Sequence, residues 1–342
     1  MKRIYQTVIF SLFALFVSTQ PLKSQSEQVI FQNDVAIAAT LKYDFRILNK
    51  TKETEEEVPA QFGIYLPDST YIEKPVNISI RGGYRKAKCT FTPIHIYFKG
   101  SGFEQDGWKD LGKVKLIRMC KSSANYNQLV IREWLVYRIY NLFTDKSYQT
   151  CLLNITMYDT GSNKKPLTTY AFLQEETDKL AERMNTEEVE PNRVLPHEFD
   201  AALLNLISVF EYMIGNLDWS AIKMHNVRTF MPTNGENPLC IPVPYDFDFS
   251  GIVNASYASP PPELAVESVR ERLFRGLCRP KNEYLEVFEM LKEKKDEIYA
   301  LIDNCPYLVK SHRKDMKTYL EQFYFVINSE KQSQREIFDN CR

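Results

Sequence analysis

Four polar residues near the middle of the chain carry the side chains that a phosphate-transferring site requires. Asp218 and Asn226 lie in the segment GNLDWSAIKMHN, and Asp246 and Asp248 follow in PYDFDFSG. Carboxylate and amide oxygens are the ligands that Mg²⁺ and Mn²⁺ prefer, and a divalent ion held by one or two protein carboxylates usually takes phosphate oxygens as further ligands. Another carboxylate can accept the proton of an attacking hydroxyl group, which is the division of roles in phosphoryl transfer.

The order of these residues indicates a role for each. Asp218 is predicted to be the catalytic base, while Asn226 and Asp246 are predicted to bind the metal ion. Asp248 is a second candidate ligand, because alternate residues of a strand face the same side. Protein kinases have the same order of catalytic Asp, metal-binding Asn and D-F-G Asp, with a shorter spacing between Asp and Asn. The alternative is that these are ordinary solvated side chains of turns and strand ends.

A helix and a hairpin are needed to position these side chains. The segment Glu198–Gly215 has apolar residues at helical spacing and ends in glycine, which predicts a helix. From Asn226 a strand-like run leads to the turn TNGEN and returns through LCIPVPYDF, which predicts a hairpin. Because a hairpin brings its end back to its start, Asp246 is expected close to Asn226 and Asp218.

The remaining segments predict strands first and helices afterwards. Short β-branched and aromatic runs predict strands before residue 120, and a helix over Asn127–Phe143 and a hairpin over Thr150–Glu176 follow. Amphipathic segments predict helices in the C-terminal part, including Pro260–Leu277. This order predicts the α+β class with two lobes, a β-rich N-terminal lobe over 26–176 and a helical C-terminal lobe over 177–342.

Composition and the first residues indicate the class of protein and its compartment. The chain has 342 residues and a net charge of −1, which argues against a nucleic-acid binder because such proteins are basic. Residues 1–25 contain Lys2 and Arg3, a short apolar run and then small and polar residues, which predicts a secretory signal peptide, with an uncleaved anchor or buried helix as the alternative. We therefore expect an exported protein, periplasmic or extracellular, without a stable membrane span after cleavage.

The seven cysteines fit this expectation without defining a disulfide framework. An odd number leaves at least one thiol unpaired or paired between chains, and no C-x-x-C pair is present. One or two disulfides are compatible with an exported protein of this length.

Short motifs in a fixed order make the chain resemble the spore-coat protein H (CotH) kinase-like family, in a branch of secreted, uncharacterised proteins. The motifs are SIRGGYRKAKCTFTPIHIYF, NQLVIREWLVYRIY, TYAFLQEETDKL, NLDWSAIKMHN and PVPYDFDFSG. The resemblance implies an atypical protein-kinase-like fold and phosphorylation of proteins with ATP and a divalent ion. It also implies that Asp218 is the catalytic Asp, that Asn226 and Asp246 are metal ligands, and that Glu175 or Glu176 is the glutamate of the strand connecting the lobes.

The chain departs from the family pattern at the nucleotide site. The lysines that usually follow the Pro of the first motif are missing from FTPIHIYF, so Lys113 or Lys115 is the candidate phosphate-binding cation, and we assign Lys115 with Glu175 and Glu176 to cofactor binding. Glu133 either pairs with such a lysine, as helix glutamates of kinases do, or is a surface charge. A G-x-G-x-x-G loop is absent from the sequence.

Together these features predict an exported, kinase-like phosphotransferase. It would use ATP and Mg²⁺ or Mn²⁺ to phosphorylate a protein or another hydroxyl-bearing substrate. The alternative is a catalytically silent binding module of the same fold at the cell surface or in the periplasm. A glycosyltransferase that uses a nucleotide sugar would need a βαβ order, which the sequence does not indicate.

Overall fold

The computed structural model describes residues 29–32, 34–66, 68–98, 100, 111–190, 194–235 and 238–342. The predicted signal peptide, residues 1–25, lies outside this part of the chain.

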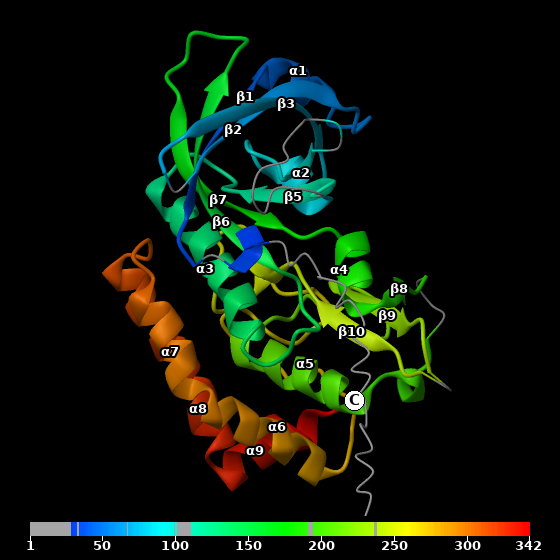
Figure 1. Ribbon diagram of the computed structural model, residues 1–342. Helices are drawn as coiled ribbons and strands as arrows, with labels where there is room; N and C mark the ends of the chain where they lie inside the picture. Colours follow the sequence, from blue (N-terminus) through cyan, green and yellow to red (C-terminus); the bar gives the residue numbers. More distant parts are fainter. Residues whose placement is uncertain are drawn as a thin grey trace, which may run out of the picture.

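Seven described strands close into a barrel in the order β1-β2-β3-β4-β5-β7-β6 (Figure 1). Their neighbours pair antiparallel, except that β1 closes the barrel by pairing in parallel with β6. The strands are β1 (Ile37–Tyr43), β2 (Val58–Tyr65), β3 (Tyr71–Ile80), β4 (Ile94–Tyr97), β5 (Lys113–Arg118), β6 (Thr150–Asp159) and β7 (Leu167–Gln174). The short helices α1 (Phe45–Lys50) and α2 (Tyr84–Lys88) lie beside the barrel.

Alternation of side chains fills the barrel with apolar residues. In β4, Ile94 and Ile96 are fully buried, while His95 and Tyr97, which alternate with them, are half-buried on the other face. This period of two is what a strand imposes, because successive side chains point to opposite faces. Consequently the inward residues form one core with the apolar residues of the helices.

Helix α3 (Ala124–Tyr140) runs from the barrel into the C-terminal region (Figure 1). Ser123 caps its first turn by accepting a hydrogen bond from the amide of Tyr126. The helix is buried on almost every side, including the charged residues Arg132 and Glu133. A helix buried to this extent forms part of the core of the molecule. Its charged side chains therefore need partners within that core.

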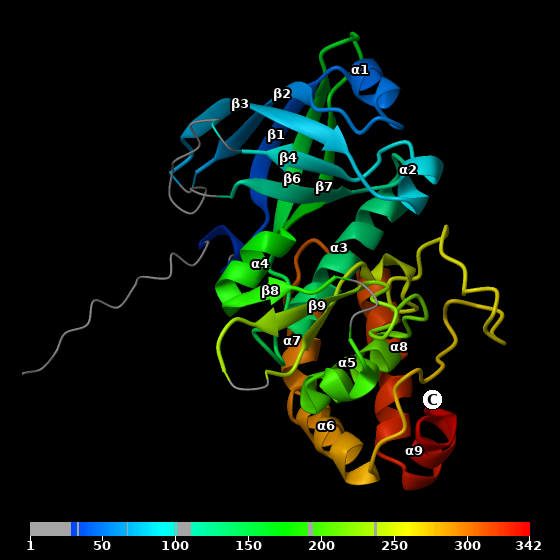
Figure 2. The same ribbon diagram turned by 90° about the vertical axis from the view of Figure 1, so that its right-hand side faces the viewer.

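The C-terminal region begins with α4 (Thr177–Met184) and combines a small sheet with helices (Figures 1 and 2). The sheet has the order β10-β9-β8, and the helix α5 packs against β10. The elements are β8 (Thr186–Glu188), α5 (Ala201–Ile214), β9 (Val227–Pro232), β10 (Ile241–Pro244), the 3₁₀ turn η3 (Phe247–Phe249), α6 (Lys281–Glu293), α7 (Lys295–Asn304), α8 (Lys310–Ile327) and α9 (Glu330–Glu336). Single 3₁₀ turns η1 (Val29–Gln32), η2 (Pro196–Glu198) and η4 (Phe338–Asn340) complete the described elements.

The two-lobed, atypical protein-kinase-like fold predicted from the sequence is wrong. The strands close on themselves into a seven-stranded barrel followed by a helical region, and only the mixed content of helices and strands agrees with the prediction. The difference arises from the parallel pairing of β1 with β6, which sets Ile37 beside Leu153. Local periodicity predicts strands but carries no signal for a pairing between such distant segments.

The helix predicted over Pro260–Leu277 is also wrong. Residues 250–280 form turns and irregular backbone along one side of the C-terminal region (Figure 2). Arg272 from this segment donates to the carbonyls of Met213 and Tyr319, and Arg270 donates to the Asp315 carboxylate, so side-chain contacts with α5 and α8 hold the segment in a non-helical path.

Two disulfides and three free thiols account for the seven cysteines. Cys89 bonds to Cys120 and Cys278 bonds to Cys341, while Cys151, Cys240 and Cys305 are free and buried. Among the helices that the structure describes, none combines the length and the apolar character needed to cross a membrane.

Candidate functional site

The predicted hairpin is confirmed and connects the two sequence segments of the site. β9 and β10 pair antiparallel with Val227 opposite Pro244, and the amide of Tyr245 donates to the carbonyl of Asn226 at 3.0 Å. Helix α5 ends at Gly215 in the left-handed conformation, so the chain turns there into the loop that carries Asp218. Asp246 therefore follows directly after the residue that is bonded to Asn226.

The Asp218 carboxylate is oriented by two loop residues and stays partly open to solvent. Its Oδ2 accepts from Asn226 Nδ2 at 3.1 Å, and its Oδ1 lies 2.8 Å from His225 Nε2. Asn226 Nδ2 also donates to the Asp218 carbonyl, and the Asp218 amide donates to Asn216 Oδ1 at 3.0 Å. With 31% of its side chain exposed, Asp218 can be reached by a substrate.

Asp246 has a strained backbone and a carboxylate without a protein partner. Its φ of 63° lies in the left-handed region, and its amide donates to the Tyr137 hydroxyl at 2.8 Å. The half-buried carboxylate makes no hydrogen bond or ion pair with any residue that the structure describes. Non-glycine residues are held in this conformation at a cost of about 1–3 kcal/mol, and such strain is concentrated at functional sites.

A buried cluster of charges, which we call the Arg85 cluster, lies behind Asp246. The Arg85 guanidinium is 3.8 Å from Glu133 and 3.8 Å from Asp248, and Asp248 Oδ2 accepts from the Tyr257 hydroxyl at 2.9 Å. Burial, with the charge of Asp246 as the second cause, raises the pKa of Asp248 to about 7. Burial and the charge of Asp248 raise the pKa of Glu133 well above its ordinary value. The cluster joins α2, α3 and η3.

Lys115 is a buried cation that faces the same region from β5. Only 6% of the residue is exposed, and its ammonium lies 5.4 Å from the ring centroid of Tyr148 and 5.7 Å from that of Tyr245. Burial lowers the pKa of Lys115 to about 8, and the charges of Glu176 and Asp246 act in the opposite direction. Glu133 is paired with Arg85 rather than with Lys115, and it is buried rather than a surface charge.

The two predicted glutamates have different surroundings. Both carboxylate oxygens of Glu175 accept hydrogen bonds from the Arg183 guanidinium, at 3.0 Å each. Oε2 also accepts a hydrogen bond from the amide of Gln149. Glu176 lies 3.2 Å from His95 Nε2, and its pKa is lowered to about 2 because the interactions with His95 and Lys115 outweigh burial, which alone would raise it. Glu175 thus ties β7 to α4, whereas Glu176 faces Lys115 and the site.

The donor set of the hairpin fits a divalent ion that shares its ligands with phosphate. Within the described residues, no group of three or more His, Cys, Asp or Glu side chains is placed to hold a metal ion. An ion bound through phosphates needs only one or two protein carboxylates. The unpartnered carboxylate of Asp246 and the amide oxygen of Asn226, whose nitrogen is occupied by Asp218, supply such ligands. Asp248 is already engaged by Arg85 and Tyr257.

Sequence reasoning missed the residues that organise the site. Arg85 was visible in the motif RGGYRKAK, but the spacing gave no sign that it would reach Glu133 and Asp248. The hydroxyls of Tyr137 and Tyr257 hold the Asp246 amide and the Asp248 carboxylate, and aromatic residues carry no sequence signal for such a role.

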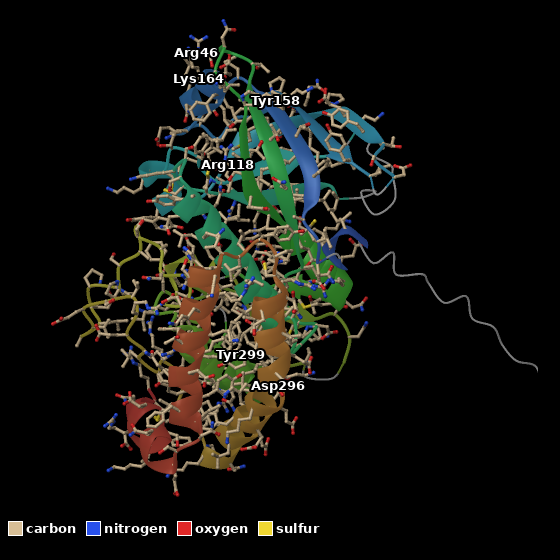
Figure 3. All side chains as sticks on the ribbon, turned by 90° about the vertical axis from the view of Figure 1, so that its left-hand side faces the viewer. Arg46, Arg118, Tyr158, Lys164, Asp296 and Tyr299 are labelled. Atoms are coloured by element: carbon tan, nitrogen blue, oxygen red, sulfur yellow. A yellow bond between two sulfur atoms is a disulfide. The ribbon has the colours of Figure 1, made fainter. Side chains whose placement is uncertain are left out.

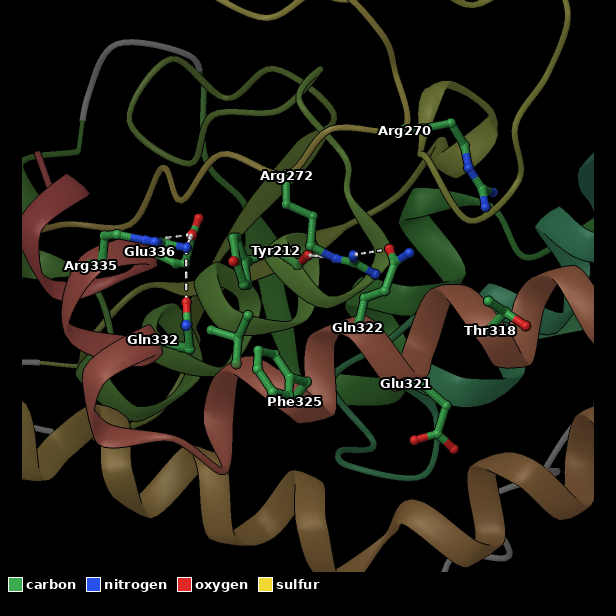
Figure 4. Close-up of a pocket in the computed structure, with 11 residues that line it drawn as sticks. Tyr212, Arg270, Arg272, Thr318, Glu321, Gln322, Phe325, Gln332, Arg335 and Glu336 are labelled. Atoms are coloured by element: carbon green, nitrogen blue, oxygen red, sulfur yellow. Dashed lines mark hydrogen bonds and ion pairs between the residues drawn. The ribbon is translucent and has the colours of Figure 1, made fainter.

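A pocket of about 560 Å³ lies elsewhere, on the C-terminal helices (Figure 4). Its arginines are already bonded to protein: Arg272 donates to the carbonyls of Met213 and Tyr319, and Arg335 to Glu336 and Gln332. This shallow pocket therefore offers a ligand little unpaired charge, and we do not place the functional site there.

Fold and site together define an α+β protein with a closed barrel and a charged, partly buried site beside a hairpin. No protein-family model matches the chain, and no curated protein matches it. The resemblance to the CotH kinase-like family thus stays a prediction from short motifs, and the function has to be argued from the site.

Proposed function

We propose that this protein is an exported phosphotransferase that moves a phosphoryl group from ATP to a hydroxyl group of a protein or another substrate with the help of Mg²⁺ or Mn²⁺. The observation that carries the proposal is the Asp246 carboxylate, which is held on a strained backbone without a protein partner. Asp246 follows Tyr245, whose amide is bonded to the carbonyl of Asn226, and it lies within the electrostatic reach of Lys115. Metal ligand, base and cation are thus in one region.

Each residue has a role in this reaction. The substrate oxygen forms a bond to the terminal phosphorus, the bond from that phosphorus to the bridging oxygen breaks, and ADP leaves with the electron pair. Asp218 accepts the proton of the attacking hydroxyl, and Asn226 keeps its carboxylate oriented. Asp246 and Asn226 would hold the ion, which when bound neutralises phosphate charge, and Lys115 would contact phosphate oxygens.

Several features support the remaining parts of the proposal. Two disulfides are typical of proteins that fold outside the reducing cytosol, in agreement with the predicted signal peptide. The net charge of −1 favours a protein or small-molecule substrate over a nucleic acid.

Phosphate transfer from labelled ATP in the presence of Mn²⁺ tests the proposal. The wild-type chain is incubated with a panel of exported proteins, and incorporation of the label is measured by mass spectrometry. Asp246→Asn should abolish transfer, whereas Asp296→Asn, which removes an exposed carboxylate on α7 far from the barrel (Figure 3), should leave it unchanged. Equal incorporation in wild type and Asp246→Asn would contradict the assigned role.

A catalytically silent binding module is the second candidate, because both Asp218 oxygens are occupied by His225 and Asn226. Thermal unfolding with ATP and Mn²⁺ separates the two. A ligand at a hundred times its Kd stabilises the folded state by about 2.7 kcal/mol. Stabilisation without any transfer would favour the silent module, and stabilisation with transfer would favour the enzyme.

A further inference from the structure

Three cations, Arg81, Lys115 and Arg228, come from separate parts of the chain and meet at the site. Their mutual repulsion is unfavourable unless negative charge compensates it. Ser79, His95 and Lys115 are cross-strand neighbours on β3, β4 and β5, so their side chains share one face of the barrel wall. Arg81 follows directly after the end of β3, and its amide donates to the carbonyl of Pro93, just before β4. Arg228 approaches from β9, and the charges of Arg81 and Arg228 both act to lower the pKa of Lys115.

The positive charge of this group is only partly paired inside the described chain. Lys115 and the Arg81 guanidinium make no hydrogen bond or ion pair with residues that the structure describes. Arg228 Nη1 pairs with Glu188 at 3.0 Å, but its Nε is buried without a partner among the described residues. The nearby Glu176 carboxylate is paired with His95. Burying the unpaired ammonium of Lys115 costs free energy, so this arrangement points to a ligand.

Aromatic rings hold the cations in place in the absence of that ligand. Tyr245 lies between Lys115, at 5.7 Å from its ring centroid, and the Arg228 guanidinium, at 5.4 Å. Tyr148 contacts Lys115 from another direction, at 5.4 Å. The negative face of an aromatic ring attracts a cation by about 0.5–2 kcal/mol. Tyr245 thus contacts both the Lys115 ammonium and the Arg228 guanidinium.

We propose that Arg81, Lys115 and Arg228 form a subsite for an oligophosphate chain. A chain of linked phosphates matches three cations spread over the barrel wall and the hairpin, because each phosphate can meet a different one, and arginine donates to phosphate in a forked geometry. The subsite deepens the proposed function, on which it rests for the identification of the chain as that of ATP. Arg228 and Arg81 become determinants of ligand binding beside Lys115.

Binding of inorganic tripolyphosphate in EDTA, measured by titration calorimetry at pH 7, tests the subsite without metal or catalysis. Arg81→Met and Arg228→Met should each weaken binding about tenfold or more, since a hydrogen bond to a charged group contributes about 1.5–3 kcal/mol. Arg46→Met is the matched control: Arg46 lies at the far end of the barrel (Figure 3) and donates to the Gly161 carbonyl, so tripolyphosphate binding should not change.

Lys115→Met distinguishes a loss of tripolyphosphate binding from a folding defect. This substitution removes a buried cation, so binding should be lost while the melting temperature stays equal or rises. ATP should bind at least as tightly as tripolyphosphate, and adenosine without phosphates should not compete.

The failure of the subsite and the failure of the proposed function are distinguishable. Wild-type affinity in Arg81→Met and Arg228→Met, an equal loss in Arg46→Met, or no binding of tripolyphosphate to the wild type would overturn the subsite. Absence of phosphate transfer with tripolyphosphate binding intact would overturn only the enzymatic proposal.

Discussion

Replacing Arg85 by methionine should destabilise the protein far more at pH 8 than at pH 5. Arg85 is the cation shared by Glu133 and Asp248, each 3.8 Å away and almost fully buried. It also donates to the carbonyl of Arg118 and lies 5.9 Å from the centroid of the Tyr257 ring. The substitution removes the charge but keeps an apolar side chain, so the result reports mainly on the two carboxyl groups left behind.

The pH dependence follows from the raised pKa values. Because the native pKa values of Asp248, about 7, and of Glu133 exceed those of the unfolded chain, these groups favour folding fully at low pH and progressively less as the pH rises. At pH 5 Asp248 is largely protonated, and the loss in Arg85→Met is limited mainly to a hydrogen bond and packing, about 1.5 kcal/mol. At pH 8 the unpaired Asp248 either ionises or keeps its proton at a cost, and breaking a buried pair then costs about 3–5 kcal/mol.

Urea unfolding at the two pH values measures this difference, with the buried Trp134 and Trp219 as fluorescent reporters. Lys86→Met is the matched control in the same helix, because Lys86 pairs with the exposed Glu55 at the surface. Such a pair contributes about 0–1 kcal/mol and should show little dependence on pH.

A combined variant sharpens the test. Adding Asp248→Asn to Arg85→Met removes the carboxylate that lost its partner, so part of the stability at pH 8 should return. Equal losses at pH 5 and pH 8, or a larger loss at pH 5, would refute the reasoning that Arg85 compensates ionised carboxyls.

Two more substitutions test buried positions outside the Arg85 cluster. Burial raises the pKa of Glu211 well above its ordinary value, against the opposing effects of Asn216 and Arg275, so wild-type stability should fall by about 1.4 kcal/mol per pH unit between the ordinary and the raised pKa. Glu211→Gln should therefore be more stable than wild type at pH 8 and converge with it near pH 4 in urea unfolding; lower stability at pH 8 would contradict this. Gly215→Ala should cost about 2 kcal/mol or more in thermal unfolding, because φ is 66° and the new Cβ would collide with the Tyr319 hydroxyl. Recovery in Gly215→Ala combined with Tyr319→Phe is expected, and full wild-type stability in the single variant would show that the loop relaxes.

Elements with a strong local pattern could be predicted from the sequence. The helices α3 and α5 and the hairpin β6–β7 occur where periodicity and turn residues indicated them. Their signals are local, since a helix needs apolar residues at a period of 3.6 and a hairpin needs a turn between two strand-like runs. The same reasoning predicted the hairpin that returns the chain to Asn226, where the amide of Tyr245 donates to the Asn226 carbonyl.

The barrel and the segment 250–280 could not be predicted, because distant contacts decide them. Parallel pairing of β1 with β6 closes the barrel without any turn signal. The amphipathic pattern of Pro260–Leu277 indicated a helix, yet Arg270 and Arg272 lie over the Tyr319 ring, 4.3 and 3.6 Å from its centroid. Stacking on that ring and donating to neighbouring carbonyls outweighs helix propensity, which amounts to less than about 1 kcal/mol per residue.

Charge pairing at the site shows why residue types alone misassign partners. Glu133 projects from α3, which packs against η3, and Arg85 of α2 lies 3.8 Å from both Glu133 and Asp248. Lys115 is thereby left without Glu133 as its partner. The charges of Glu176 and Asp246 favour the charged form of Lys115, while Glu176 is bonded to His95 and the Asp246 carboxylate has no partner among the described residues. In the proposed function a metal ion would meet Asp246 and phosphate oxygens would meet Lys115, so that a bound metal–phosphate complex would neutralise the carboxylate and the ammonium together.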